Sequence, residues 1–115
     1  MPSKNHIHLC ATFLCINPTP KTTLGCNGSI NTPYTAIDNN LEINAIRLIQ
    51  NETNTFIITV DTLFVTNDMI DELISSLSPK YNLKKEQFML IASHTHYAPF
   101  LDKSKPNLGD VDPDY

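Results

Sequence analysis

The sequence has little of several things that would narrow its function. It contains no tryptophan, only three glycines and only 17% charged residues. Its eight lysines and arginines are scattered, so it has no basic patch, and we do not expect nucleic acid as a partner. The three cysteines, Cys10, Cys15 and Cys26, cannot all pair within the chain and lack the CxxC spacing of a metal knuckle. We expect reduced thiols.

A long apolar run is also missing. The longest, over residues 9–16, contains Thr12 and is far shorter than the roughly 20 residues of a membrane-spanning helix. The first residues carry neither the basic start nor the small-residue cleavage site of a secretion signal. Together with the reduced thiols, this pattern predicts a soluble cytoplasmic protein without a membrane span.

The sequence does have a globular balance, with 41% apolar residues. Its length fits one domain, but a chain of this size buries only about two-thirds of the surface that its unfolded state exposes. A deep pocket lined by this chain alone would therefore be hard to build. We expect residues 1–115 to be one part of a larger unit.

Hydrophobic periodicity predicts four strands and one helix. The strands span residues 6–16, 41–50, 56–60 and 88–92. The first and last are continuous apolar runs, typical of strands buried on both faces, whereas the second alternates apolar and polar side chains. A period of 3.6 predicts a helix over residues 68–77, with a start at Thr66 or Asn67 and an end marked by Pro79.

The order of these elements indicates the fold class. Residues 17–40 are rich in Pro, Thr, Gly and Asn and predict a long loop, and residues 51–54 predict a turn. The third strand, the helix and the fourth strand form a βαβ crossover with a parallel pair. The fold class is therefore α/β with a mixed sheet. After Pro99 the chain becomes polar and no further element is predicted, so the architecture is incomplete.

All four histidines occur in HxH pairs, His6/His8 and His94/His96. Positions i and i+2 of an extended chain point to the same side, so each pair can present two imidazoles to one metal ion or substrate. The second pair follows the C-terminal end of a predicted strand, where open α/β sheets place their ligand crevices. The first pair begins a strand near the terminus and is expected to be exposed without a role. Only antiparallel strands would bring the two pairs together.

Asp61 ends the third predicted strand, so we expect it at the same edge of the sheet as the second histidine pair. Its carboxylate could accept the second ring N–H of a metal-binding histidine or bind metal itself, and alternatively it begins the turn before the helix. Ser93 and Thr95 lack the glycine elbow of a nucleophile, and support of the imidazoles is the simpler role. A catalytic zinc usually has three protein ligands and a water, so this segment would supply one or two.

The segment at residues 92–99 (ASHTHYAP) resembles the THTHSGP or SHTHxxP signature of the neutral and alkaline, non-lysosomal ceramidases and their bacterial relatives. Further segments follow in that family's order. Residues 17–20 (NPTP) are similar to its DITP segment and residues 24–26 (LGC) to its LxGY segment. Residues 37–42 (IDNNLE) resemble the lead into its LxARAL strand, and residues 60–61 a strand that ends in Asp. The resemblance covers nearly the whole chain but only the opening part of the family's catalytic domain.

The resemblance implies that the chain is an N-terminal fragment of a ceramidase-like domain, a zinc-dependent amide hydrolase. The implied substrate is a small-molecule or lipid amide such as N-acylsphingosine. The resemblance implies zinc as the cofactor, His94 as a zinc ligand and His96 as a second active-site histidine beside the substrate amide. Asp61 is a further catalytic candidate because of its place at the end of the neighbouring strand. The family's other ligands, a His, a Glu and a Tyr, come from later positions that this chain does not contain. We therefore expect the chain alone to bind zinc weakly and to be inactive.

The sequence departs from the family pattern at several positions. Asn17 replaces an Asp, Cys26 a Tyr and Asn44 an Arg, and Tyr97-Ala98 replaces Ser-Gly beside the candidate site. Two other functions stay open. One is a non-catalytic metal-binding or interaction module that uses all four histidines. The other is an unrelated metallohydrolase whose metal site begins with HxH, but such families place further His or Asp at short spacing, and none follows here.

Overall fold

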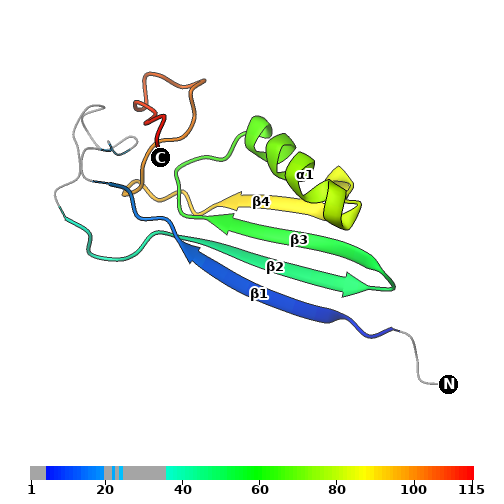
Figure 1. Cartoon of the computed structure of the whole chain (residues 1–115). Coiled ribbons are helices and arrows are strands. Elements are labelled where there is room, and N and C mark those ends of the chain that lie inside the picture. Colours follow the sequence, from blue (N-terminus) through cyan, green and yellow to red (C-terminus); the bar gives the residue numbers. More distant parts are fainter. Residues whose placement is uncertain (1–4, 20–21, 23, 25–35) are drawn as a thin grey trace.

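The computed structural model describes residues 5–19, 22, 24 and 36–115. Its elements are β1 (His8–Cys15), β2 (Glu42–Gln50), β3 (Thr53–Val60), α1 (Asn67–Tyr81), the 3-10 turn η1 (Lys85–Gln87) and β4 (Phe88–Ala92). Within the described residues the strands form one sheet in the order β1-β2-β3-β4, and α1 lies against one face of it (Figure 1). The predicted α/β class is confirmed.

The strand directions confirm the predicted crossover. β1 is antiparallel to β2 and β2 to β3, whereas β3 and β4 are parallel, with Phe56 beside Phe88 and Val60 beside Ala92. Two reversals give β1 the same direction as β3 and β4. The last residues of these three strands, Cys15, Val60 and Ala92, therefore lie at the same end of the sheet, which we call the carboxyl end.

The β2–β3 hairpin closes with a two-residue turn instead of the predicted turn over residues 51–54. Asn51 and Glu52 have φ values of 49° and 66°. Two consecutive positive φ values are typical of a type I′ turn, whose twist matches that of the strands. Asn54 lies inside β3, where its Oδ1 accepts a hydrogen bond from Arg47 Nε at 2.8 Å. The third strand is consequently longer than predicted and begins at Thr53.

The start of α1 agrees with the sequence prediction. Thr66 is the N-cap, with extended φ and ψ of −116° and 160°, and its Oγ1 accepts a hydrogen bond from Met69 N at 3.3 Å. This bond gives a partner to one of the first backbone N–H groups, which have none inside the helix. Asp68 in the first turn and Lys80 in the last turn complement the helix dipole.

We expect the Thr66→Ala substitution to lower the free energy of unfolding by about 1 kcal/mol, because the Met69 N–H loses its side-chain partner. Urea unfolding measures this change. Ser76→Ala is the matched control, since Ser76 is exposed and its hydroxyl only donates back to the Glu72 carbonyl oxygen inside the helix. A loss no greater in Thr66→Ala than in Ser76→Ala would contradict the capping role.

The prediction that Pro79 ends the helix is wrong. α1 continues through Pro79 to Tyr81, and Asn82, in the left-handed conformation, donates its N–H to Ser78 O at 2.8 Å. Proline lacks the N–H that would bond to the carbonyl oxygen four residues earlier, so other contacts must hold this turn. The extra turn places the Tyr81 ring 5.0 Å from the Phe56 ring. This contact with the sheet stabilises the extension beyond the proline.

The sheet is more exposed than its apolar sequence predicts. All eight residues of β1 are exposed, and in β4 Met89 and Ile91 are 54% and 41% exposed. The prediction that these two strands are buried on both faces is wrong, because both are edge strands and α1 covers only one face. The predicted apolar face of α1 does point toward the sheet and is half-buried along its length, at Met69, Ile70, Leu73, Ile74 and Leu77.

The most completely buried side chains lie beyond the carboxyl end of the sheet. Leu63, Ala98 and Phe100 are 2%, 0% and 1% exposed. The segment after Pro99 was predicted to be polar and without further structure, yet its Phe100 is a core residue. A parallel bridge between Phe100 and Val111 folds this segment back on itself. The core of the protein is therefore built by loops as much as by the sheet.

The last residues of the chain also pack against this end of the sheet. The Tyr115 hydroxyl donates a hydrogen bond to the Ile16 carbonyl oxygen. Burial, helped by the nearby Cys15 and Asp61, raises the pKa of Tyr115 to about 12. Figure 1 shows the C-terminus close to the point where β1 ends.

Two further sequence predictions concern the loops and the membrane. The predicted loop over residues 17–40 lies largely outside the described residues. Its described positions form no helix or strand, and Leu24 makes an isolated bridge with Pro99. No helix in the described part of the chain is both long and apolar enough to cross a membrane.

Candidate functional site

The histidine pair predicted to bind metal follows β4 at the carboxyl end of the sheet. Ser93 N donates to Val60 O at 3.0 Å, which extends the pairing of β3 and β4 by one residue. His94 then turns out of the strand with a φ of 61°. This left-handed conformation costs a residue with a Cβ about 1–2 kcal/mol, so its surroundings must hold it in place.

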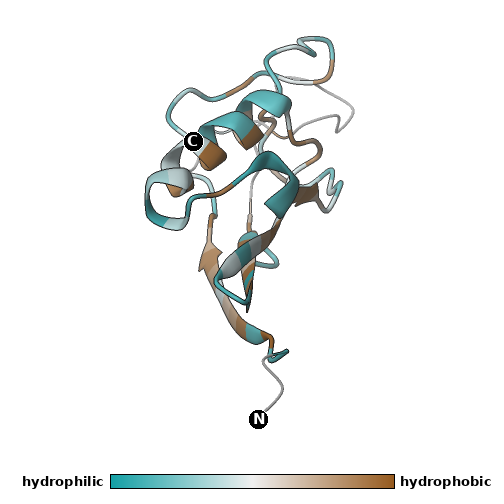
Figure 2. Ribbon diagram, turned by 90° about the vertical axis from the view of Figure 1, so that its right-hand side faces the viewer, coloured by the Kyte–Doolittle hydropathy of each residue, from teal (hydrophilic) through white to brown (hydrophobic). Residues whose placement is uncertain are grey.

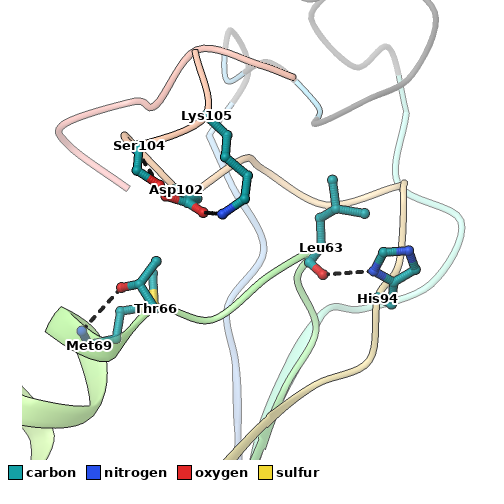
Figure 3. Close-up of polar contacts among 7 residues, drawn as sticks. All are labelled: Leu63, Thr66, Met69, His94, Asp102, Ser104 and Lys105. Carbon is teal, nitrogen blue, oxygen red and sulfur yellow. Dashed lines mark hydrogen bonds and ion pairs between the residues drawn. The ribbon is translucent and has the colours of Figure 1, made fainter. Parts of the chain in front are cut away.

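The His94 ring is held by the loop that follows β3. Its Nδ1 lies 3.0 Å from the carbonyl oxygen of Leu63 (Figure 3). The Phe64 ring packs edge-on against it at a centroid distance of 5.4 Å. A carbonyl oxygen only accepts hydrogen bonds, so Nδ1 carries the proton and Nε2 keeps its lone pair in the neutral ring. A metal-binding histidine is commonly oriented in this way. His94 thus presents Nε2 as a possible ligand.

His96 lies directly beside this ring. The two imidazole centroids are 5.2 Å apart and the ring planes are almost perpendicular, at 88°. Both side chains are exposed. Thr95, between them, was expected to support the imidazoles, but its Oγ1 accepts a hydrogen bond from Tyr97 N at 3.2 Å and so stabilises the turn. The structure brings the two histidines together at one accessible position.

Asp61 lies at the same end of the sheet but makes different contacts. Its Oδ2 accepts a hydrogen bond from Glu42 N at 2.9 Å, and its own N–H donates to Glu42 O at 3.0 Å. Of the alternatives for Asp61, the hydrogen bond from His94 is not formed, because His94 Nδ1 contacts the Leu63 carbonyl oxygen instead. Asp61 lines a pocket of about 440 Å³, with Thr95 and Tyr97 among its other walls. Neither histidine of the pair lines that pocket.

The first histidine pair lies elsewhere. His8 begins β1, and β1 runs in the same direction as β4, so His8 lies at the opposite end of the sheet from His94. A strand of this length spans about 25 Å. One chain therefore cannot bring both pairs to one metal ion. The module of four histidines in one site has no support in the fold.

The fit of zinc to these residues is partial. A protonated Nδ1 on His94 and a second imidazole beside it are suitable donors for zinc. A catalytic zinc site nevertheless needs three protein ligands. Within residues 5–19, 22, 24 and 36–115, no group of three or more His, Cys, Asp or Glu side chains is placed to hold a metal ion. The described residues thus offer two imidazoles that suit zinc and not the three ligands of a catalytic site.

An ion pair between the buried Asp102 and the half-exposed Lys105 supports the loop that holds His94. Asp102 accepts hydrogen bonds from the backbone N and the hydroxyl of Ser104 and pairs with the Lys105 ammonium (Figure 3). That ammonium also lies 5.0 Å from the centre of the Phe64 ring. Its hydrogen bond to Asp102 is the main cause that lowers the pKa of this carboxyl, Ser104 lowers it further, and burial opposes them. Phe64 is in this way fixed between Lys105 and the histidine.

This ion pair predicts an acid-dependent contribution to stability. Because the pKa of Asp102 is lowered by folding, the unfolded chain takes up the proton first as the pH falls. The contribution is complete above the ordinary carboxyl range and is lost as the pH falls through the lowered pKa. We expect Asp102→Asn to reduce the free energy of unfolding by about 1–3 kcal/mol at neutral pH. The further decrease of this free energy in acid should be smaller in the variant than in the original protein. Urea unfolding at about pH 7 and about pH 3 tests this, and equal acid sensitivity of the two proteins would contradict it.

Sequence reasoning missed the two residues that orient His94. Leu63 acts through its backbone carbonyl, which no side-chain pattern reveals. Phe64 belongs to an apolar run whose pattern predicts only a core residue.

A comparison of the sequence with protein-family models and with curated proteins finds no match.

Proposed function

We propose that the chain is the N-terminal part of a larger zinc-dependent amide hydrolase of the neutral ceramidase type, acting in the cytoplasm on an N-acyl amide such as N-acylsphingosine. The observation that carries the proposal is the contact of His94 Nδ1 with the Leu63 carbonyl oxygen. It fixes the tautomer in which Nε2 can bind a metal, at the sheet end where α/β enzymes place their sites. The resemblance of residues 92–99 to the ceramidase signature supports the same role.

Each residue has a distinct role in this proposal. His94 binds the metal, and its left-handed backbone turns the ring away from the strand toward Leu63 and Phe64. His96 holds a proton beside the amide and delivers it to the leaving nitrogen. Zinc, when bound, supplies an activated water and polarises the amide carbonyl. Asp61 joins the end of β3 to the start of β2 through its hydrogen bond with Glu42, and it lines the neighbouring pocket. It is therefore a positioning residue.

The missing ligands make the proposal testable. It requires a His, a Glu and a Tyr that the described residues do not place at this site. We expect the reading frame downstream of the Tyr115 codon to encode them. A downstream sequence without these residues would contradict the proposal.

The activity itself can be tested with that longer polypeptide. We expect zinc-dependent release of fatty acid from N-acylsphingosine, which is lost in His94→Ala and retained in His6→Ala. The 115-residue chain by itself should release none. Activity that survives His94→Ala, or zinc-dependent hydrolysis by the 115-residue chain, would show that the ligands have been assigned wrongly.

A further inference from the structure

One face of the sheet is apolar and uncovered. Strand pairing places Ala11, Ile46, Ile57 and Met89 in one row across all four strands. The neighbouring rows add Leu9 and Leu48 on one side and Phe13 and Ile91 on the other. We call these eight residues the open face. Figure 2 shows the apolar colouring of the strand that rises from the N-terminus.

The helix lies on the other face. Tyr81 of α1 contacts Phe56 and the Arg47 guanidinium, and the register places these two residues side by side. Side chains alternate between the two faces along a strand, so the open face, which holds Ile57, lies opposite α1. Leu9 and Phe13 are 63% and 66% exposed there. In the described structure no element covers this face.

The open face carries almost no charge. Along the four strands, the residues that point to this side include one ionisable acid, Glu42, at the end of β2. The other polar members are threonine, asparagine, glutamine and cysteine. An uncharged apolar surface of this kind meets a copy of itself without like-charge repulsion. A face that bound anionic lipid would carry lysine or arginine, and this face has none.

The size of the face also suits self-association. Four strands of five to nine residues, about 4.8 Å apart, cover roughly 500 Å² in plan. Protruding side chains add to the surface that is removed from water when such a face is covered. Stable interfaces bury about 800 Å² per partner, and an apolar patch of this extent on a lone chain is already at the upper end for monomers.

We propose that the open face is a dimer interface on which a second copy of the chain stacks its own open face. The two sheets would lie about 10 Å apart, as in β-sandwiches, with each α1 on the outside. A twofold axis would bring the same patch of both copies together. The carboxyl end with His94 stays at the rim of the sandwich. This inference does not depend on the proposed hydrolase function.

Sedimentation equilibrium of the full 115-residue chain tests the proposal. We expect a species of twice the 12.9 kDa chain mass that dissociates on dilution. Phe13→Lys should raise the dissociation constant at least about 100-fold, because it puts an unpaired charge into the apolar interface. Leu14→Lys is the matched control, since Leu14 is 64% exposed in the same strand but points to the helix side. It should leave the dissociation constant within about twofold of the original.

A further variant decides the remaining outcome. If Phe13→Lys fails to fold by circular dichroism, Met89→Lys tests the same face from its other edge. A monomeric wild type, equal weakening by Leu14→Lys, or a dimer kept in folded Phe13→Lys or Met89→Lys would overturn the stacked arrangement.

Discussion

Replacing Phe100 by alanine is expected to lower the free energy of unfolding by about 3–5 kcal/mol. The Phe100 side chain is 1% exposed, and Ala98, two residues earlier, is fully buried. A Cβ on Gly109 would lie 2.8 Å from Phe100 Cγ, so the ring rests directly on the Gly109 backbone. Loops surround this ring, and we expect them not to close over the cavity that its removal leaves. A small domain is stable by only about 5–15 kcal/mol, so this loss is a large share of the total.

Urea unfolding followed by circular dichroism measures the effect, with the slope of the transition as a check on the unfolded state. Tyr97→Ala is the matched control because it also removes an aromatic ring from this loop, from a position that is 74% exposed. We expect its effect to stay within about 0.5 kcal/mol. Similar losses for both variants would show that the segment after Pro99 does not form the core.

The second large effect is expected in zinc binding. His94→Ala should weaken the affinity of the chain for zinc at least about tenfold, because it removes the imidazole whose tautomer Leu63 fixes. His6→Ala removes the same side chain from the other HxH pair, which lies at the far end of the sheet, and should change the affinity less than about twofold. Calorimetric titration of the three proteins measures the affinities. Equal losses from both substitutions would mean that zinc does not distinguish the two pairs.

Much of the fold could be predicted because local patterns and long-range packing agree. β4 has the predicted bounds at Phe88 and Ala92, and its parallel pairing with β3 follows from the helix between them. Pro79 misled because proline restricts a helix locally, whereas the contact of Tyr81 with Phe56 comes from tertiary packing. The apolar residues of β1 predict burial, but a single sequence does not reveal which neighbour covers a strand.

The location of the candidate site could be predicted from the sequence, but the contacts of its residues could not. Two histidines after a parallel strand had to lie at the carboxyl end of the sheet, and His94 and His96 do lie together there. The left-handed backbone of His94 has no sequence signal, since histidine adopts it only occasionally. Because Asp61 ends the neighbouring strand, it was a candidate to orient the imidazole, with the start of a turn as the alternative. Its carboxylate instead accepts a hydrogen bond from Glu42 N, which links the end of β3 to the start of β2.

The central claim is that the protein orients His94 through Nδ1 so that Nε2 binds the metal. Nitrogen-15 correlation spectra of the histidine rings, recorded with and without zinc, test it most directly. We expect His94 Nδ1 to stay protonated throughout and zinc to shift the resonance of His94 Nε2, with no change at His6 or His8. A zinc-dependent shift at His94 Nδ1, or shifts confined to His6 and His8, would contradict it.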